Sequence, residues 1–244
     1  MTNLISLEKK AEKVGILLTK KGINQAPIMR VGIAIDVSGS MSQLYSSGAL
    51  QTAFDQMMGV AVKFDDNGEL DVFQFNTDCK YIGTSNPSNY SDYVRKNISI
   101  SGGTNYGPIV EQATNFFFGG SVGEKKGFLG GLFGKKAEAT PASTDNTPVL
   151  MLVLTDGEPN DRAATQRLLE QNQSRPIYWH FVGIGGNRRS FPTIAKLADA
   201  LPNVGEVYLD RLQMSDDEIY EQLICDELVQ WIGGYAQGAQ AARG

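Results

Sequence analysis

Two apolar segments of this chain each lead to an aspartate, and this arrangement constrains the fold more than any other feature. Val31–Ile35 (VGIAI) runs directly into Asp36, and Val149–Leu154 (VLMLVL) is followed by Thr155 and Asp156. Continuous apolar runs of this length are typical of buried strands in a sheet that is covered on both faces. Each strand therefore delivers a carboxylate to the carboxyl edge of the sheet, where such sheets bind their ligands.

Residues 36–40 (DVSGS) add two hydroxyl groups to the first carboxylate. Residues two apart in an extended or turning backbone point the same way, so Asp36, Ser38 and Ser40 can converge while Gly39 relaxes the turn. Carboxylate and hydroxyl oxygens are hard ligands that suit Mg²⁺ or Mn²⁺. The pattern predicts a metal site, and the alternative is that these side chains only cap a helix and a turn.

A second loop, residues 101–108 (SGGTNYGP), supplies a third hydroxyl from Thr104. Its two adjacent glycines free the backbone to approach an ion, and Pro108 suits the first turn of a following helix. Three loops thus offer five oxygen-bearing side chains, from Asp36, Ser38, Ser40, Thr104 and Asp156.

With these five positions, the chain resembles the von Willebrand factor A (vWA) family and its metal-ion-dependent adhesion site (MIDAS), from about Met29 onward. The resemblance implies that Ser38, Ser40 and Thr104 contact the ion directly or through water, and that the two aspartates act largely through water. It implies Mg²⁺ as the ion, with Mn²⁺ or Ca²⁺ as alternatives. A carboxylate from a partner protein would complete the coordination.

Strands and helices alternate along the chain, which predicts an α/β fold of Rossmann-like vWA type. We expect a mostly parallel sheet with helices on both faces and an antiparallel edge made by Leu70–Phe75 and Cys79–Ile82 around the turn Asn76–Asp78. Helices are expected at Asn3–Lys20, Ala49–Phe64, Asp92–Asn97, Tyr106–Phe118, Arg162–Gln171, Pro192–Ala200 and Asp216–Tyr235; the remaining strands are Ile177–Val182 and Val204–Leu209.

The composition indicates one domain over residues 1–244, because 244 residues with 41% hydrophobic content suffice for one large α/β core. We expect a helical extension at 1–28 that packs on this domain. The charged amino terminus lacks the apolar segment of a signal peptide, and only Cys79 and Cys225 are present. Both observations predict a cytoplasmic protein with reduced thiols.

Residues 119–148 form an insertion that is too long for an ordinary helix-to-strand connection. It contains GFLGGLFG at 127–134, flanked by two lysine pairs, Lys125–Lys126 and Lys135–Lys136. This mixture of basic and apolar residues could touch a partner groove or a membrane surface, although a flexible loop is the simpler interpretation. As a contact region it would lie away from the metal edge, so that the protein would be an adaptor with two faces.

The rival from another class is a Mg²⁺-dependent phosphatase or phosphotransferase of the haloacid dehalogenase type, with Asp36 as nucleophile. That family needs an aspartate two residues later as general acid, whereas Ser38 cannot protonate a leaving group at neutral pH. We therefore expect a binding module and no enzyme.

The net charge of −5 argues against nucleic-acid binding. His180 is interpreted as structural, and Glu158 and Asp161 either tune the site or cap the next helix.

Within the vWA family, the chain most resembles bacterial tellurium-resistance-type and copine-like cytosolic proteins. That resemblance implies a role in a stress-response complex, in which the ion binds an acidic residue of another protein.

Overall fold

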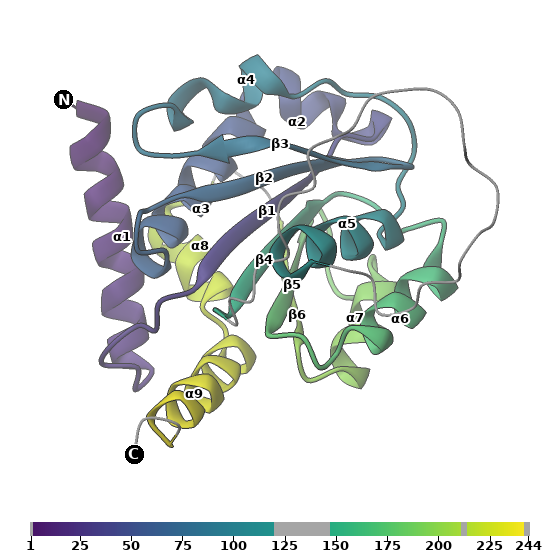
Figure 1. Cartoon of the computed structure of the whole chain (residues 1–244). Helices are drawn as coiled ribbons and strands as arrows, with labels where there is room; N and C mark the ends of the chain where they lie inside the picture. Colours follow the sequence, from purple (N-terminus) through teal and green to yellow (C-terminus); the bar gives the residue numbers. More distant parts are fainter. Residues whose placement is uncertain (1, 120–146, 211–213, 242–244) are drawn as a thin grey trace, which may run out of the picture.

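The computed structural model describes residues 2–119, 147–210 and 214–241, and in these residues one six-stranded sheet forms the centre of the molecule (Figure 1). The strand order is β3-β2-β1-β4-β5-β6. The strands are β1 (Arg30–Asp36), β2 (Leu70–Phe75), β3 (Cys79–Ser85), β4 (Val149–Thr155), β5 (Ile177–Ile184) and β6 (Val204–Leu209).

Every strand pairing is parallel except that of β2 with β3, which is antiparallel and forms one edge of the sheet. The predicted mostly parallel sheet with an antiparallel edge is therefore confirmed. The neighbours β1 and β4 pair in the register Ile35↔Leu154. Their carboxyl ends consequently lie side by side, although more than a hundred residues separate them in the chain.

Helices cover both faces of the sheet (Figure 1). Side chains of α1, α3, α8 and α9 belong to the core on one face, and those of α5, α6 and α7 to the core on the other. The helices are α1 (Thr2–Lys20), α2 (Ser42–Ser46), α3 (Ala49–Phe64), α4 (Tyr93–Asn97), α5 (Gly107–Phe118), α6 (Arg162–Gln171), α7 (Pro192–Ala200), α8 (Asp216–Leu223) and α9 (Asp226–Ala241).

The central strands are apolar on both sides because each side meets a helical layer. All seven residues of β4 and all eight of β5 are buried. In β5, Tyr178 and Val182 join one core, while Trp179 and Phe181 join the other. This alternation follows from the two-residue period of a strand, and it explains why these segments read as continuous apolar runs in the sequence.

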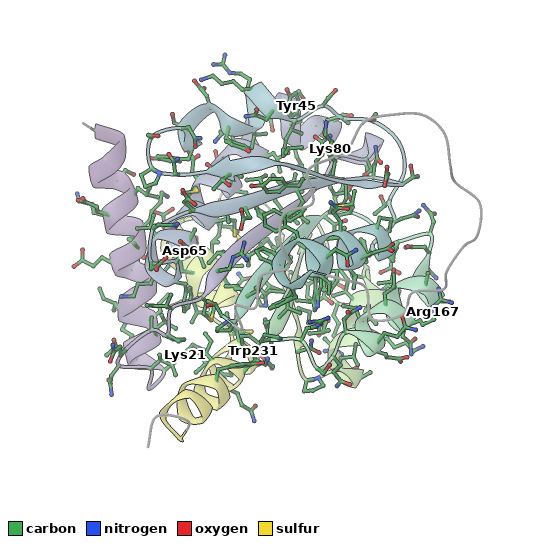
Figure 2. All side chains as sticks on the ribbon, viewed as in Figure 1. Lys21, Tyr45, Asp65, Lys80, Arg167 and Trp231 are labelled. Atoms are coloured by element: carbon green, nitrogen blue, oxygen red, sulfur yellow. The ribbon has the colours of Figure 1, made fainter. Side chains whose placement is uncertain are left out.

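Helix α1 packs along α3, and the absence of a side chain at Gly59 allows a close approach. A Cβ atom built on Gly59 of α3 would lie 2.7 Å from the Cβ of Lys10 in α1. The Lys10 Nζ in turn binds Asp216 of α8 at 2.6 Å. The lysine Lys21, just after α1, pairs with Asp226 at the start of α9; Figure 2 labels it near Trp231 of that helix.

The single helix expected at Asp216–Tyr235 is wrong, because the structure divides this segment into α8 and α9. Ile224 leaves the helical conformation with φ −89° and ψ 57°. A new helix then starts with Asp226 and Glu227 in its first turn, where acidic side chains favour the N-terminal end of the helix dipole. Helix α9 can therefore take its own direction away from the body of the sheet (Figure 1).

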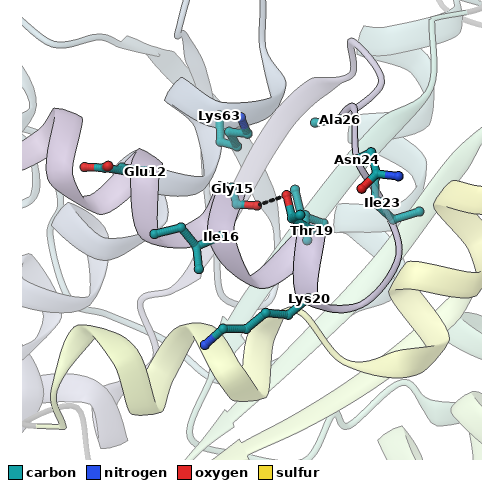
Figure 3. Close-up of a pocket in the computed structure, with 10 residues that line it drawn as sticks. Glu12, Gly15, Ile16, Thr19, Lys20, Ile23, Asn24, Ala26 and Lys63 are labelled. Atoms are coloured by element: carbon teal, nitrogen blue, oxygen red, sulfur yellow. Dashed lines mark hydrogen bonds between the residues drawn. The ribbon is translucent and has the colours of Figure 1, made fainter.

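The proposed insertion at 119–148 lies almost wholly outside the described residues. A surface pocket is lined by residues of α1, the following loop and α3, including Gly15, Ile16, Ile23 and Lys63 (Figure 3). That pocket lies toward the amino end of β1, since Met29 just before β1 donates its N–H to the carbonyl of Phe64. Among the residues described, no helix combines the length and apolar character needed to cross a bilayer.

Candidate metal centre

The candidate centre lies where β1 and β4 end. Asp36 is the last residue of β1, and the chain then turns through a short 3₁₀ helix (Gly39–Met41) into α2. Asp156 directly follows β4. The structure therefore places both aspartates at the carboxyl edge of neighbouring strands, in agreement with the sequence prediction.

Asp36 is fully buried, and hydrogen bonds hold both of its carboxylate oxygens. The backbone N–H of Ser38 donates to Oδ1 at 2.8 Å, and the hydroxyl of Thr155 donates to Oδ2 at 2.7 Å. Burial raises the pKa of Asp36; the hydrogen bonds from Thr155 and Ser38 oppose this shift, and the charge of Asp156 adds to it. A positive charge beside these two carboxylates would remove much of this cost.

The hydroxyl groups of residues 38 and 40 connect the two strand ends. The Oγ atoms of Ser38 and Ser40 are 3.1 Å apart, and the Ser40 hydroxyl donates to Asp156 Oδ1 at 2.7 Å. This last bond joins residues 116 positions apart in the chain. Four of the five predicted ligands thus form one connected cluster, which comprises Asp36, Ser38, Ser40 and Asp156.

Thr104 lies in the loop between α4 and α5, and it is 7% exposed. Its Oγ1 is 3.8 Å from the position of a Cβ atom built on Gly157, the residue after Asp156. Backbone hydrogen bonds also join this loop to the first one, from Gly39 N–H to the Gly102 carbonyl at 3.1 Å. The fifth predicted ligand therefore belongs to the same edge of the sheet.

The donor set fits a hard divalent cation. It combines two carboxylates with three hydroxyl groups, and oxygen ligands of this kind suit Mg²⁺, Mn²⁺ and Ca²⁺. Across the described ranges, no three His, Cys, Asp or Glu side chains gather in a group that could hold a metal ion. A site at this edge would therefore depend on its serine and threonine hydroxyls.

Two acidic residues of the loop after β4 bind the N-terminal ends of helices instead of joining the cluster of candidate ligands. Asp161 accepts the backbone N–H groups of Tyr106 and Gly107, at 3.0 and 2.9 Å, and so caps α5. Glu158 accepts the N–H and the hydroxyl of Thr193 at the start of α7. Asp161 is also the N-cap residue of α6, where its backbone carbonyl accepts the N–H of Thr165 at 2.9 Å, although its side chain makes no cap hydrogen bond to a backbone N–H of α6.

Sequence reasoning missed four residues that support the centre: Asn76, Tyr106, Thr155 and Asn160. The phenol of Tyr106 donates to the Gly157 carbonyl beneath the site. For Thr155, a signal existed, since a polar residue ends an otherwise apolar strand. The other three act through contacts between loops, which no local pattern reveals.

His180 has no part in this cluster. It is fully buried in β5, its ring nitrogens have no hydrogen-bond partner in the described residues, and burial lowers its pKa to about 4. The structural interpretation of this histidine agrees with its position in the core.

The central sheet, its helical layers and the loops at its carboxyl edge define a vWA α/β fold. The chain belongs to the vWA-TerF-like family, described as vWA found in TerF C terminus, whose model matches residues 28–240. Domains of the vWA class are typically adhesion or interaction modules. The chain is also 26% identical over 227 residues to the protein described as "Uncharacterized protein YcbR" from Bacillus subtilis (strain 168), covering 91% of this chain and 84% of that protein.

Solved structures show the same fold at low identity. Proximal thread matrix protein 1 from the mussel byssus is 15% identical with a TM-score of 0.58, over 84% of this chain and 49% of that chain. Another structure of that protein, described as having a zinc-occupied MIDAS motif, is 16% identical with a TM-score of 0.53, over 83% of this chain and 46% of that one. The present chain thus spans about half the length of these solved chains.

Proposed function

We propose that this chain is a divalent-metal-dependent protein-binding module. Asp36, Ser38, Ser40, Thr104 and Asp156 would hold the ion, which supplies an open coordination position for a carboxylate of a partner protein. The observation that carries the proposal is the 2.7 Å hydrogen bond from Ser40 to Asp156, because it brings ligands from two separate strand ends to one point. The zinc-occupied motif described for the mussel protein supports a divalent ion at such a point.

The surrounding residues give this site its geometry. Asp36 cannot rotate, since Ser38 and Thr155 fix its two oxygens. Ser40 is exposed at the surface, so a partner's carboxylate could reach an ion beside it. The hydrogen bonds that run from Ser38 through Ser40 to Asp156 would open as the two hydroxyls turn toward the cation.

The buried position of Asp36 argues against the phosphatase alternative. A nucleophile must present an oxygen to substrate, whereas both oxygens of Asp36 are engaged and the side chain is fully buried. Mg²⁺-dependent hydrolysis of p-nitrophenyl phosphate that disappears in Asp36→Asn would reverse this choice. We propose that the chain has no catalytic activity.

The finer parts of the proposal concern the biological setting. We propose a cytoplasmic role in a bacterial stress-response or tellurium-resistance complex, supported by the match to the family named for TerF. The segment 119–148 would provide a second contact, with a protein groove or a membrane surface. Deleting that segment should leave metal binding intact, and a loss of metal binding would refute the two-face arrangement.

The test is a pull-down from cell extract with immobilised protein, in Mg²⁺ and in EDTA. Ser40→Ala removes a candidate ligand at an exposed position, and Ser46→Ala in α2 is its matched control, an exposed serine whose hydroxyl binds a local carbonyl. We expect a partner that wild type and Ser46→Ala retain only with Mg²⁺, and that Ser40→Ala does not retain. Partners that bind equally in EDTA and to Ser40→Ala would overturn the proposal.

A further inference from the structure

The backbone that leads to Thr104 is too flexible to determine the position of the Thr104 hydroxyl on its own. Gly102 and Gly103 precede it, and Gly102 has a φ of +81°, a conformation that L side chains rarely adopt. Glycines make the backbone at this point unusually free. The position of Thr104 must therefore come from bonds that neighbouring loops make to its own loop.

Asn160 makes two such bonds, and both go to one atom. Its backbone N–H and its side-chain Nδ2 each donate to the Thr104 carbonyl oxygen at 2.9 Å. Two donors from different directions orient the peptide plane that follows Thr104. Because the χ1 angle of a threonine is restricted, orienting the backbone also orients the hydroxyl.

Asn160 also lies in the same loop as the candidate ligand Asp156. Asn160 follows Asp156 in the loop after β4, so its amide ties Thr104 to the loop of another candidate ligand. On its far side, the same threonine loop is held by Asn76, whose Nδ2 donates to the Ser101 carbonyl at 2.9 Å. Of the two asparagine side chains, that of Asn160 donates to Thr104 itself and that of Asn76 donates to Ser101.

We propose that Asn160 is a positioning residue of the metal centre, whose side-chain amide holds the Thr104 hydroxyl toward the ion that Asp156 faces. This inference rests on the proposed function. A residue that merely fastens two loops would affect stability, whereas a positioning residue affects metal affinity through Thr104. The two roles are therefore distinguished by whether the effect of Asn160 depends on the Thr104 hydroxyl.

The experiment measures binding of Mn²⁺ alone by electron paramagnetic resonance, in wild type, Asn160→Ala, Thr104→Ala and the double variant. Asn160→Ala keeps the backbone donor and loses only the amide. We expect its Mn²⁺ affinity to fall roughly threefold to tenfold, the effect of one hydrogen bond. In the Thr104→Ala background the same change should alter the affinity less than about twofold, because the hydroxyl it positions is gone.

Asn97→Ala is the matched control, since Asn97 is an exposed asparagine whose Nδ2 donates to the Tyr93 carbonyl at 2.8 Å, away from the centre. It should bind Mn²⁺ like wild type. Wild-type affinity in Asn160→Ala, or equal losses in both backgrounds, would overturn the positioning role and leave the metal site standing. A wild-type protein that binds no Mn²⁺ would instead overturn the proposed function, and this inference with it.

Discussion

Replacing Thr155 with valine tests whether hydrogen bonds beneath the candidate centre hold Asp36 in place. The substitution nearly preserves the shape of the side chain and removes one hydroxyl group. That hydroxyl is fully buried, donates to Asp36 Oδ2 at 2.7 Å and accepts the N–H of Gly157 at 3.2 Å. Thr155→Val therefore removes the donor to Asp36 Oδ2, while Ser38 still binds Oδ1, and it removes the acceptor of the Gly157 N–H.

The expected cost follows from these two losses. A hydrogen bond to a charged group contributes about 1.5–3 kcal/mol and an ordinary one about 1 kcal/mol. We expect Thr155→Val to lower the free energy of unfolding by about 2–4 kcal/mol. In a domain of this size each kcal/mol lowers Tm by about 2–4 °C, so Tm should fall by about 5–15 °C.

The assay is urea unfolding followed by circular dichroism, in buffer without divalent ions. Thr114→Val is the matched control, because the Thr114 hydroxyl is buried and has no hydrogen-bond partner in the described residues. Removing it should leave stability unchanged or raise it, since an unpaired buried hydroxyl is unfavourable. Equal unfolding free energies for Thr155→Val and Thr114→Val would refute the reasoning.

Two further perturbations test the core. The pKa of His180 is about 4 in the folded protein and about 6.5 in the unfolded chain. Lowering the pH from 6.5 to 4 should therefore destabilise the wild-type fold, by about 3 kcal/mol at the lower pH. Urea unfolding across pH should show that His180→Leu lacks this component; parallel pH profiles would contradict it. Gly59→Ala should cost about 1–3 kcal/mol, as its Cβ would meet Lys10 at 2.7 Å. Gly233→Ala, with nothing within 4 Å, should be neutral or stabilising by calorimetry, and equal effects of the two changes would contradict the packing of α1 on α3.

The strands that carry the site were predictable because buried strands of this kind are apolar at every position. Val31–Ile35 and Val149–Leu154 are apolar throughout, since helices cover both faces of the sheet, and each is followed closely by an aspartate. That their carboxyl ends lie at one edge follows from the parallel direction of the strands, and the strand order makes them neighbours. That the residues at these ends bind a metal stays a prediction, which the pull-down and Mn²⁺ measurements address.

The break between α8 and α9 was not predicted, because the apolar pattern continues through it. Tyr220, Ile224, Leu228 and Ile232 are all buried and follow one another at a spacing of four residues, which one helix could also satisfy. The acidic pair after Cys225 was the available signal for a new helix start. The helical character of the segment was predicted correctly, whereas the direction of each helix depends on tertiary contacts such as the pairing of Lys21 with Asp226.

The acidic residues of the loop after β4 show what a partner would have to supply. Glu158 and Asp161 are near enough in sequence to serve as ligands, yet each is bound to the N-terminus of a helix, α7 and α5 respectively. Moving either one would leave backbone N–H groups without an acceptor, at a cost comparable to a lost hydrogen bond. Only Asp36 and Asp156 therefore remain as carboxylates of the proposed site. In the proposed site, two carboxylates would balance the charge of a divalent ion and three hydroxyls would fill further positions, which leaves the remaining position to the carboxylate of a partner protein.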